Sequence, residues 1–344
     1  MAKASSVVAA QVKEHALQLG FSRVGIARAE SLTEEHSRLQ QWLARGLNGE
    51  MKWMERDPAQ RTDPRLCFPP ARSVIVVALN YYTDHEHEVR TACGSGRAKS
   101  EALTGKVSRY AWGDDYHEVV AGKLRELLSW IKQQHTEAEG KVCVDIQPVM
   151  DKAWAARAGL GWIGKHTNLI TPEFGSWVFI GELLLNLDLE PEDTEIADQC
   201  GSCSLCIDAC PTSAIVEPYV LDANLCISHA TIESRTSEIR ADVADHLEGW
   251  LYGCDICQDV CPWNHMTSVS IEPRFQPRAG NVNASLSEIQ QLTPAAYAER
   301  FRGSAMKRAK LAGLQRNARA LVLAAGADVS SASGAIQKNT QKGS

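Results

Sequence analysis

Hydrophobic positions along the first half of the chain alternate between helical and strand spacing. Residues 5–20 carry apolar side chains every three or four positions before Gly20, which predicts a helix, and residues 115–133 repeat this pattern. Between these segments lie short apolar runs rich in β-branched residues, which predict strands. The runs are FSRVGIA (21–27), SVIVVAL (73–79), KVCVDI (141–146) and WVFIGELLL (177–185). Alternating helices and strands predict a domain of the α/β class over residues 1–190.

The pattern changes several times outside these elements. Residues 83–106 are polar and lack an apolar period, which predicts an exposed loop, and the acidic stretch 187–198 is typical of a linker. Residues 285–326 are helical in pattern, with Ser285 and Ser287 as candidate caps. We expect the chain to divide at these changes into residues 1–190, 191–268, 269–327 and a mobile tail, 328–344.

Composition describes an ordinary globular protein. The 344 residues are 44% hydrophobic and 23% charged, and the net charge of −6 gives no overall signal for nucleic acid. The N-terminus is too polar for a signal peptide, and no stretch approaches 18 apolar residues. We therefore expect a cytoplasmic protein without a membrane contact, in which thiols stay reduced and clustered cysteines bind metal.

Eight of the eleven cysteines lie between residues 200 and 261. The run CGSCSLCIDACP (200–211) has the spacing C-x2-C-x2-C-x3-C-P, which is typical of proteins that bind iron–sulfur clusters. In such runs the fourth cysteine ligates a second cluster, so a second group of cysteines is expected. That group is present, as Cys226 and the motif GCDICQDVCP (253–262).

Crossed pairing uses all eight cysteines and predicts two [4Fe-4S] clusters. The first cluster would be held by Cys200, Cys203, Cys206 and Cys261. The second would be held by Cys210, Cys226, Cys254 and Cys257. A structural zinc site is the alternative, because C-x2-C pairs also bind zinc. The two C-x3-C-P endings argue against zinc, and clusters of this kind imply that another part of the chain receives single electrons.

The stretch DKAWAARAGLGWIGKHTNLIT (151–171) contains two nucleotide-binding patterns in the wrong context. Its glycines match G-x-G-x-x-G, but they follow a predicted helix where the dinucleotide fingerprint requires a strand. The segment 159–165 matches G-x-x-x-x-G-K, but His166 stands where a phosphate-binding loop needs Ser or Thr. A helix stop with a glycine turn and a solvated Lys165 explains the pattern. The alternative is a close backbone approach to another large, flat cofactor.

Asp151 begins the predicted helix and has two interpretations. It can be an ordinary N-cap aspartate. It can also be a proton donor, provided that apolar surroundings raise its pKa from about 4 toward neutrality.

Further motifs give the chain a family resemblance. These are RTDPR (61–65), SRYAWGDDYH (108–117), CISHATIE (226–233), YGCDICQDVCPWN (252–264) and the late GSAMKR segment. Together with residues 151–165 and the cysteine run, they resemble the epoxyqueuosine reductases over nearly all of residues 5–325. The resemblance implies an oxidoreductase that removes the epoxide oxygen of epoxyqueuosine at the wobble position of a tRNA anticodon. This reaction is the last step of queuosine biosynthesis.

The resemblance also implies the cofactors and the architecture. A nitroreductase-like domain would bind cobalamin, a ferredoxin-like domain would hold two [4Fe-4S] clusters, and a helical C-terminal part similar to HEAT repeats would hold tRNA. Electrons from the clusters would produce cob(I)alamin, and Asp151 would be the catalytic acid. The implied partners are tRNAs with GUN anticodons (Asp, Asn, His, Tyr) and a low-potential donor such as flavodoxin or ferredoxin, with the chain acting as a monomer.

Cobalamin contacts carry over to particular positions. The candidates are Arg61, Ser108, Asp151, Lys165, Asn168, Gly175, Ser176 and Asp255. One departure is visible in CISHATIE, where His229 stands in the place of a tyrosine that relatives commonly have.

A basic segment near the C-terminus supports an RNA partner independently. Residues 300–319 contain seven basic residues and no acid. In an acidic chain such a helical stripe favours phosphate binding over an ordinary solvated face, in which acids would be interleaved. The candidate tRNA-binding residues are Arg302, Lys307, Arg308, Lys310 and Arg316.

Two other functions remain open at this point. A cobalamin-dependent reductive dehalogenase would share the cofactors but act on small organohalides, and its usual twin-arginine export signal is absent here. A ferredoxin-like electron carrier fused to a docking domain would leave Asp151 and the glycine turn without a role.

Overall fold

The computed structural model describes residues 2–84, 103–191 and 194–326. A four-stranded sheet with the order β1-β2-β7-β4 forms the centre of the N-terminal half. Its strands are β1 (Arg23–Arg28), β2 (Ser73–Asn80), β4 (Gly140–Cys143) and β7 (Val178–Leu185). All four predicted strands are therefore confirmed, and so is the mixed α/β fold. Each neighbouring pair in this sheet is antiparallel.

Helices cover both faces of this sheet because the buried side chains of β7 alternate between them. Phe179 and Leu183 belong to one core with α1 (Ala2–Gln18) and α6 (Tyr116–Gln134). Val178 and Leu184 belong to the opposite core, which α7 (Asp151–Arg157) covers. Each large aliphatic side chain buried in this way stabilises the fold by about 1.5–3 kcal/mol.

Local sequence explains where these elements begin and end. Asp115 is the N-cap of α6, and its side chain accepts a hydrogen bond from the backbone N of His117. Strand β4 is shorter than the predicted run 141–146 because Asp145 adopts a left-handed backbone with φ of 55°. That turn redirects the chain toward α7.

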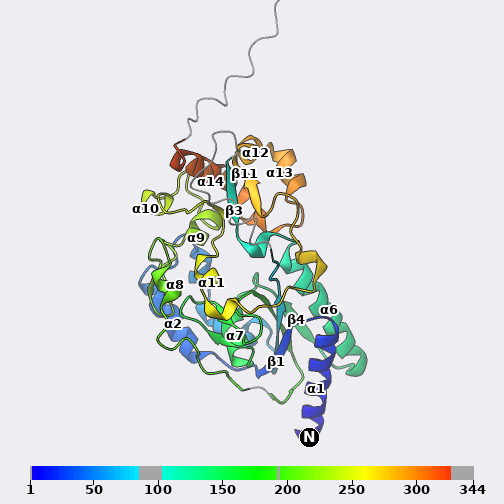
Figure 1. Ribbon diagram of the computed structural model, residues 1–344. Coiled ribbons are helices and arrows are strands. Elements are labelled where there is room, and N and C mark those ends of the chain that lie inside the picture. The colour runs from blue at the N-terminus through cyan, green and yellow to red at the C-terminus, as the bar shows by residue number, and fades with distance from the viewer. Residues whose placement is uncertain (1, 85–102, 192–193, 327–344) are drawn as a thin grey trace, which may run out of the picture.

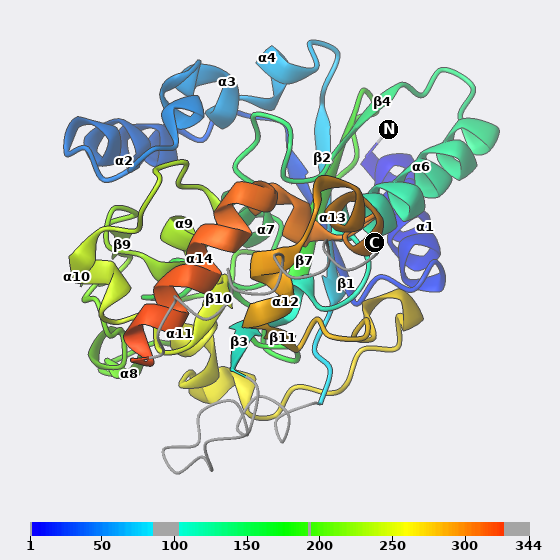
Figure 2. The ribbon, with the colours of Figure 1, turned by 90° about the horizontal axis from the view of Figure 1, so that it is seen from above.

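Shorter elements extend the N-terminal half beyond the sheet. Figure 2 shows α2, α3 and α4 on the side away from α1 and α6. Their bounds, with those of the 3₁₀ turn η1, are α2 (Thr33–Ala44), η1 (Lys52–Glu55), α3 (Pro58–Thr62) and α4 (Pro64–Cys67). A hairpin of β5 (Trp162–Ile163) and β6 (Leu169–Ile170) follows α7.

A second, three-stranded sheet has the order β10-β3-β11. Its strands are β3 (Thr104–Val107), β10 (Trp250–Tyr252) and β11 (Asn283–Ser285). The expectation of a loop over 83–106 is thus wrong at its end. Gly105 marks close packing there, since a Cβ on it would lie 2.6 Å from the Cβ of Leu251.

The cysteine-rich region consists of short elements beside the central sheet (Figure 1). They are α8 (Leu205–Asp208), β8 (Ile215–Glu217), β9 (Val220–Leu221), α9 (Ile227–Ile232), α10 (Ala241–Ala244), α11 (Ile256–Asp259) and η3 (Pro262–Asn264). The remaining 3₁₀ turns outside the C-terminal part are η2 (Arg109–Ala111) and η4 (Pro273–Phe275).

The C-terminal part is helical, as predicted, but it is not one continuous helix. It contains α12 (Leu286–Gln291), α13 (Pro294–Arg300), η5 (Ala305–Ala309) and α14 (Lys310–Ala324). Ser285 caps α12, whereas Ser287 lies inside that helix. These helices share a hydrophobic core with Val107, Trp112 and Tyr252, so the packing crosses the proposed boundaries of residues 190 and 268.

Some expectations fall outside the described residues. The tail 328–344 and most of the loop 83–106 belong to this group. Within the described part of the chain, no helix combines the length and apolarity needed to cross a membrane.

Candidate functional site

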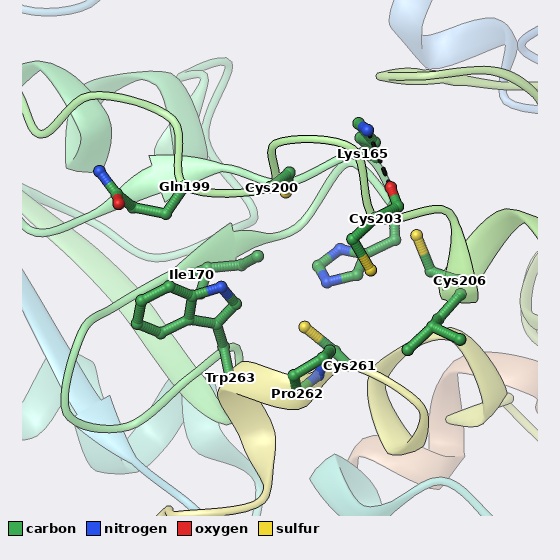
Figure 3. A pocket seen from close by; sticks show the side chains of 11 residues that line it. Lys165, Ile170, Gln199, Cys200, Cys203, Cys206, Cys261, Pro262 and Trp263 are labelled. Atoms are coloured by element: carbon green, nitrogen blue, oxygen red, sulfur yellow. Dashed lines mark hydrogen bonds between the residues drawn. The ribbon is translucent and has the colours of Figure 1, made fainter.

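Four cysteines from two distant segments line one pocket. They are Cys200, Cys203, Cys206 and Cys261. Figure 3 shows the sulfur atoms of Cys203, Cys206 and Cys261 directed toward the same space. The structure thus brings together the four residues predicted for the first cluster, which we call the outer group.

The other four cysteines form a second set, the inner group. Its members are Cys210, Cys226, Cys254 and Cys257. The Cys257 thiol interacts electrostatically with those of Cys226 and Cys210, and the Cys254 thiol interacts with Cys257 and Cys226. Cys257 also interacts with Cys206, so the two groups are neighbours. Cys261 lies four residues after Cys257 but interacts with Cys200, Cys206 and Cys203, which agrees with crossed pairing.

The outer four thiols surround a pocket. In the ranges that the structure describes, no group of three or more His, Cys, Asp and Glu side chains is placed to hold a single metal ion. Burial raises the pKa of Cys261 to about 11 and that of Cys257 above its usual value, so cationic iron would compensate thiolates that are otherwise unfavourable here.

The cluster loops are fastened to the N-terminal half by buried hydrogen bonds. Ser108 Oγ donates to Asp255 Oδ1 at 2.5 Å, and the backbone N of Arg109 donates to Asp255 Oδ2 at 2.7 Å. The backbone N of Ser176 donates to Asn264 Oδ1 at 2.6 Å. Ser108, Ser176 and Asp255 were all candidate cobalamin contacts, but in this structure their side chains bind other parts of the protein.

Gly175 lies at the same contact between the cluster loops and the N-terminal half of the chain. Its φ is 53°, and a Cβ on it would lie 1.9 Å from Asn264 Oδ1. This glycine is therefore required by the contact with Asn264, whether or not a cofactor approaches its backbone.

Lys165 is not solvated as expected. Its ammonium donates to the carbonyl oxygen of Cys203 at 2.8 Å (Figure 3) and to that of Gly201 at 2.6 Å. These two hydrogen bonds hold the outer cysteine loop. The glycine turn before it has a structural cause, because a Cβ on Gly161 would lie 2.0 Å from the carbonyl oxygen of Ile170 in the β5–β6 hairpin.

Asp151 is the first residue of α7 and is not its cap. The N-cap is Met150, and no side chain caps this helix. Asp151 Oδ1 accepts a hydrogen bond from the backbone N of Asp145 at 3.2 Å. Burial, followed by the negative charge of Asp145, raises the pKa of Asp151 to about 6. The N-cap interpretation is therefore wrong, and the pKa lies where a proton donor needs it.

Asp145 stays ionised because two neighbours stabilise its charge. Tyr116 Oη donates to Asp145 Oδ2 at 2.5 Å, and His117 Nε2 lies 3.4 Å from the same oxygen. Burial would raise the pKa of Asp145, but these contacts lower it. Burial likewise opposes the charged form of His117, yet Asp115 and Asp145 raise its pKa to about 9. One carboxyl is thus held ionised beside another whose pKa is raised, which is a pattern of acid–base sites.

Glu182 is a third carboxyl that the sequence analysis missed. It lies on β7 and is 0% exposed, and its polar neighbour is the carboxyl of Asp151. Burial, then the neighbouring Asp151 carboxyl, raises its pKa well above the usual value. A single acid in the apolar run WVFIGELLL was the available signal.

Lys152 lies between these carboxyls and the inner cysteines. It interacts electrostatically with Asp145 and Asp151 on one side and with Cys257 and Cys226 on the other. Its ammonium donates to Asn168 Oδ1 at 2.8 Å, so the predicted cofactor contact Asn168 has a partner within the protein. The inner group is consequently the one adjacent to Asp151.

Arg61 lies near Asp151. Its guanidinium donates to the carbonyl oxygen of Trp53 at 2.9 Å and stacks 5.0 Å from the Trp53 ring centroid. It interacts with Asp151, while its buried Nε has no partner among the described residues. A polar group of a cofactor would satisfy that nitrogen, so the residues present around Arg61 and Asp151 fit such a ligand.

The basic C-terminal residues separate into three kinds. Arg316 is 4% exposed and donates to the carbonyl oxygens of Ala230, Ser234 and Thr236. It is a structural residue in this fold and cannot offer its guanidinium to a phosphate. Arg308 makes a paired contact of 2.8 and 2.7 Å with Glu233, an acid outside the basic segment.

Arg302, Lys307 and Lys310 are exposed. Arg302 lies 2.6 Å from Glu299 in a surface pair with both side chains about three-quarters exposed, which is worth little energy. No ion pair found in the described part of the chain involves Lys307 or Lys310.

His229 is the residue that departs from the expected tyrosine. Its Nε2 accepts a hydrogen bond from the backbone N of Glu50 at 3.2 Å, and its ring packs on Gly49. This histidine therefore joins the loop before η1 to the segment that carries Cys226.

Comparisons with known proteins agree with this geometry. The family model described as "Epoxyqueuosine reductase QueG, DUF1730" matches residues 61–146, and the model of a "4Fe-4S double cluster binding domain" matches residues 199–264. The epoxyqueuosine reductase of Cellulophaga algicola is 45% identical over 306 residues, which cover 89% of this chain and 95% of the relative. That of Gloeobacter violaceus is 44% identical over 325 residues, with 92% and 97% covered.

Solved structures give the same result. An epoxyqueuosine reductase bound to an epoxyqueuosine-modified tRNA-Tyr stem loop has a TM-score of 0.83 at 30% identity, with 92% of this chain and 81% of that chain covered. The Bacillus subtilis enzyme, solved with a catalytic aspartate loop swung out of the active site, has a TM-score of 0.82 at 29% identity, with 92% and 82% covered. A reductive dehalogenase is 15% identical with a TM-score of 0.43, which carries no argument for that alternative. The relatives, the cysteine spacing and the two groups of thiols together place the chain in the epoxyqueuosine reductase family, a family of oxidoreductases.

Proposed function

We propose that this chain reduces the epoxide of epoxyqueuosine in tRNA to the cyclopentene of queuosine. The reaction consumes two electrons and two protons and releases the epoxide oxygen as water. The inner and outer cysteines would hold two [4Fe-4S] clusters that deliver the electrons one at a time. Arg61 and the turn around Asn168 would hold cobalamin, which when bound supplies a centre able to collect both electrons.

The chain's own contribution to the chemistry is proton control at Asp151. Its carboxyl has a pKa of about 6 because of burial and the negative charge of the neighbouring Asp145, so about a tenth of it is protonated at pH 7 and more at lower pH. We assign it as the donor to the departing oxygen. The catalytic aspartate loop described for the Bacillus subtilis relative supports this role, since Asp151 directly follows the loop after β4.

The location of Asp151 is the observation that carries this proposal. Lys152, the next residue, interacts with both Asp151 and the inner cysteines. Electrons that arrive at the inner group are thereby delivered beside the acid that supplies a proton.

Replacing Asp151 tests the assignment. Asp151→Asn removes the acid but keeps its shape, and we expect turnover to fall by about 10²- to 10⁴-fold while both cluster signals and cofactor absorption remain. Asp242→Asn, at an exposed position, is the matched control. Full activity in Asp151→Asn would remove Asp151 from the mechanism, whereas inactivity of the unaltered holoenzyme on epoxyqueuosine tRNA would refute the function itself.

The proposed tRNA surface uses Lys307 and Lys310, with Arg302 and Arg308 beside them. Lys307 and Lys310 are exposed cations. Their neighbours Met306 and Ala309 are buried in the core that joins both halves of the chain, so the backbone of this segment is held in place. The solved relative with a bound tRNA stem loop supports this partner. The proposal also includes the preference for tRNAs with GUN anticodons, the low-potential electron donor and the monomeric state. It further describes the N-terminal domain as nitroreductase-like and the C-terminal helices as HEAT-like.

Charge reversal tests this surface. Lys307→Glu with Lys310→Glu should weaken tRNA binding and reduce the slope of log affinity against log salt by about 0.7–0.9 per lost phosphate contact. The same reversal at Arg125 and Lys132, which are exposed on α6, is the matched control. Equal affinities for both double variants would reject the proposed surface.

A further inference from the structure

His166 is a buried histidine in the pocket of the outer cysteines. It is 4% exposed and lines this pocket together with Cys200, Cys203, Cys206 and Cys261. In the sequence it was notable only because it interrupts a false phosphate-binding pattern. Neither the acid site nor the proposed tRNA surface uses it.

Hydrogen bonding fixes which nitrogen of His166 carries a proton. The backbone N of Asn168 donates to His166 Nδ1 at 3.2 Å. Because Nδ1 accepts this bond, the ring is neutral and its proton lies on Nε2.

The structure shows no hydrogen-bond partner for the Nε2–H group among the residues that it describes. This nitrogen is buried. A buried donor left in this state costs about 1–3 kcal/mol, so its retention needs an explanation. Nδ1 of His166 is engaged by the backbone N–H of Asn168. Nε2 is therefore the ring nitrogen available to a group bound in the pocket.

The surroundings keep the ring in this orientation. The side chain of Asn168 is itself held, because its Oδ1 accepts a hydrogen bond from Lys152. On the other side Gly164 leaves room for the ring, since a Cβ there would lie 3.1 Å from His166 Cε1. The imidazole is therefore fixed by its neighbours before any ligand binds.

We infer that His166 donates its Nε2–H to a sulfur of the iron–sulfur cluster held by the outer group and thereby raises the reduction potential of that cluster. The inference rests on the proposed ligand set. One-electron reduction takes a [4Fe-4S] cluster from the 2+ to the 1+ state and adds negative charge to its sulfurs. A hydrogen bond to sulfur stabilises the reduced state more than the oxidised state, so the potential rises.

The position of this bond suits the direction of electron flow. The outer group includes the exposed Cys203, whereas the inner group adjoins Asp151. A hydrogen bond from His166 to the outer cluster would make that cluster easier to reduce by an external electron donor. His166 would thus be a positioning residue for electron entry, with no contact to the substrate.

A redox titration followed by electron paramagnetic resonance tests this inference on the anaerobic holoenzyme. His166→Phe keeps a ring but removes the N–H, and we expect the midpoint potential of the outer cluster to become more negative. If the reduced-to-oxidised ratio at fixed ambient potential falls tenfold, the shift corresponds to about 59 mV. The inner cluster is the internal control and should keep its potential.

The conservative variant distinguishes hydrogen bonding from packing. His166→Gln can still offer an N–H and should restore much of the outer potential. An unchanged outer potential in His166→Phe, or an equal shift in both variants, would overturn the inference.

A second measurement applies if His166→Phe does not assemble the outer cluster. Holoenzyme labelled with ¹⁵N-histidine should show a weak nitrogen coupling to the reduced outer cluster by pulsed resonance, and His166→Gln should lose it. Absence of that coupling in the labelled protein would also overturn the inference. Both measurements are independent of tRNA turnover, so failure of the proposed function is recognised separately.

Discussion

The outer and inner cysteine groups are supplied by the same two motifs but lie in different surroundings. The outer group takes three cysteines from the first motif and Cys261 from the second. The inner group takes Cys254 and Cys257 from the second motif and Cys210 from the first, and Cys226, which lies between the motifs, completes it. The outer group includes the exposed Cys203 and is held by Lys165. The inner group lies beside Lys152, which also interacts with the carboxyls of Asp145 and Asp151.

This difference suggests two separate roles for the two groups, namely electron entry from solution and electron transfer toward Asp151. The outer surroundings favour exchange with a partner in solution, because one ligand reaches the surface. Under the proposed function, the inner surroundings favour transfer to a site where Asp145 and Asp151 control the proton supply. We therefore expect the surroundings of the two groups to set the direction of electron flow, since both motifs contain C-x2-C and end in C-x3-C-P.

The largest expected effect comes from removing one cysteine ligand from either group, because this should abolish one cluster and leave the other. Cys257 and Cys261 lie in one short motif, yet we expect Cys257→Ala to abolish the inner cluster signal and Cys261→Ala to abolish the outer one. Cys200→Ala should match Cys261→Ala. Iron content and paramagnetic resonance of anaerobic protein measure this outcome, and loss of the same signal from Cys257→Ala and Cys261→Ala would disprove crossed pairing.

The next largest effect concerns the pH dependence of kcat, which tests the role of Asp151 beside the inner group. Asp151 donates only when protonated, so kcat should fall about tenfold per pH unit above its pKa of about 6, provided that chemistry limits the rate. Asp145→Asn removes the neighbouring negative charge, which lowers the pKa of Asp151 and moves this decline to lower pH. The check is a kcat profile from pH 5 to 9 with both cluster signals monitored; identical profiles for the two proteins would contradict the coupling.

The smallest effect concerns the outer side alone. Lys165→Met removes two hydrogen bonds to the outer cysteine loop, a loss of about 1–3 kcal/mol in local stability. We expect the outer cluster to be lost several-fold faster in the presence of an iron chelator, with the inner cluster unaffected. Lys132→Met on α6 is the matched control. Equal acceleration for both clusters would show that Lys165 supports the fold in general.

Particular residues show how far the sequence could be interpreted. Cysteine spacing predicted both groups, because ligand spacing is a local property of the chain, and hydrophobic periodicity predicted all four strands of the central sheet. Charge was a weaker guide. The basic segment contains no acid, but Glu233 and Glu299 from outside pair with Arg308 and Arg302, and Arg316 is buried. Glu233 comes from a distant segment and Glu299 stands one residue before the basic segment, so a count over residues 300–319 includes neither.

The sequence by itself determined which residues can bind iron, where the helices and strands form, and which family the motifs resemble. Tertiary structure decided which cysteine group adjoins Asp151, that Glu182 lies buried beside it, and that Ser108 and Asp255 fasten one half of the chain to the other. It also decided that Nε2 of His166 is left without a hydrogen-bond partner in the part of the chain that the structure describes. The physical reason is that pKa values and hydrogen-bond partners depend on burial and on neighbours far apart in sequence, which appear only when the chain has folded.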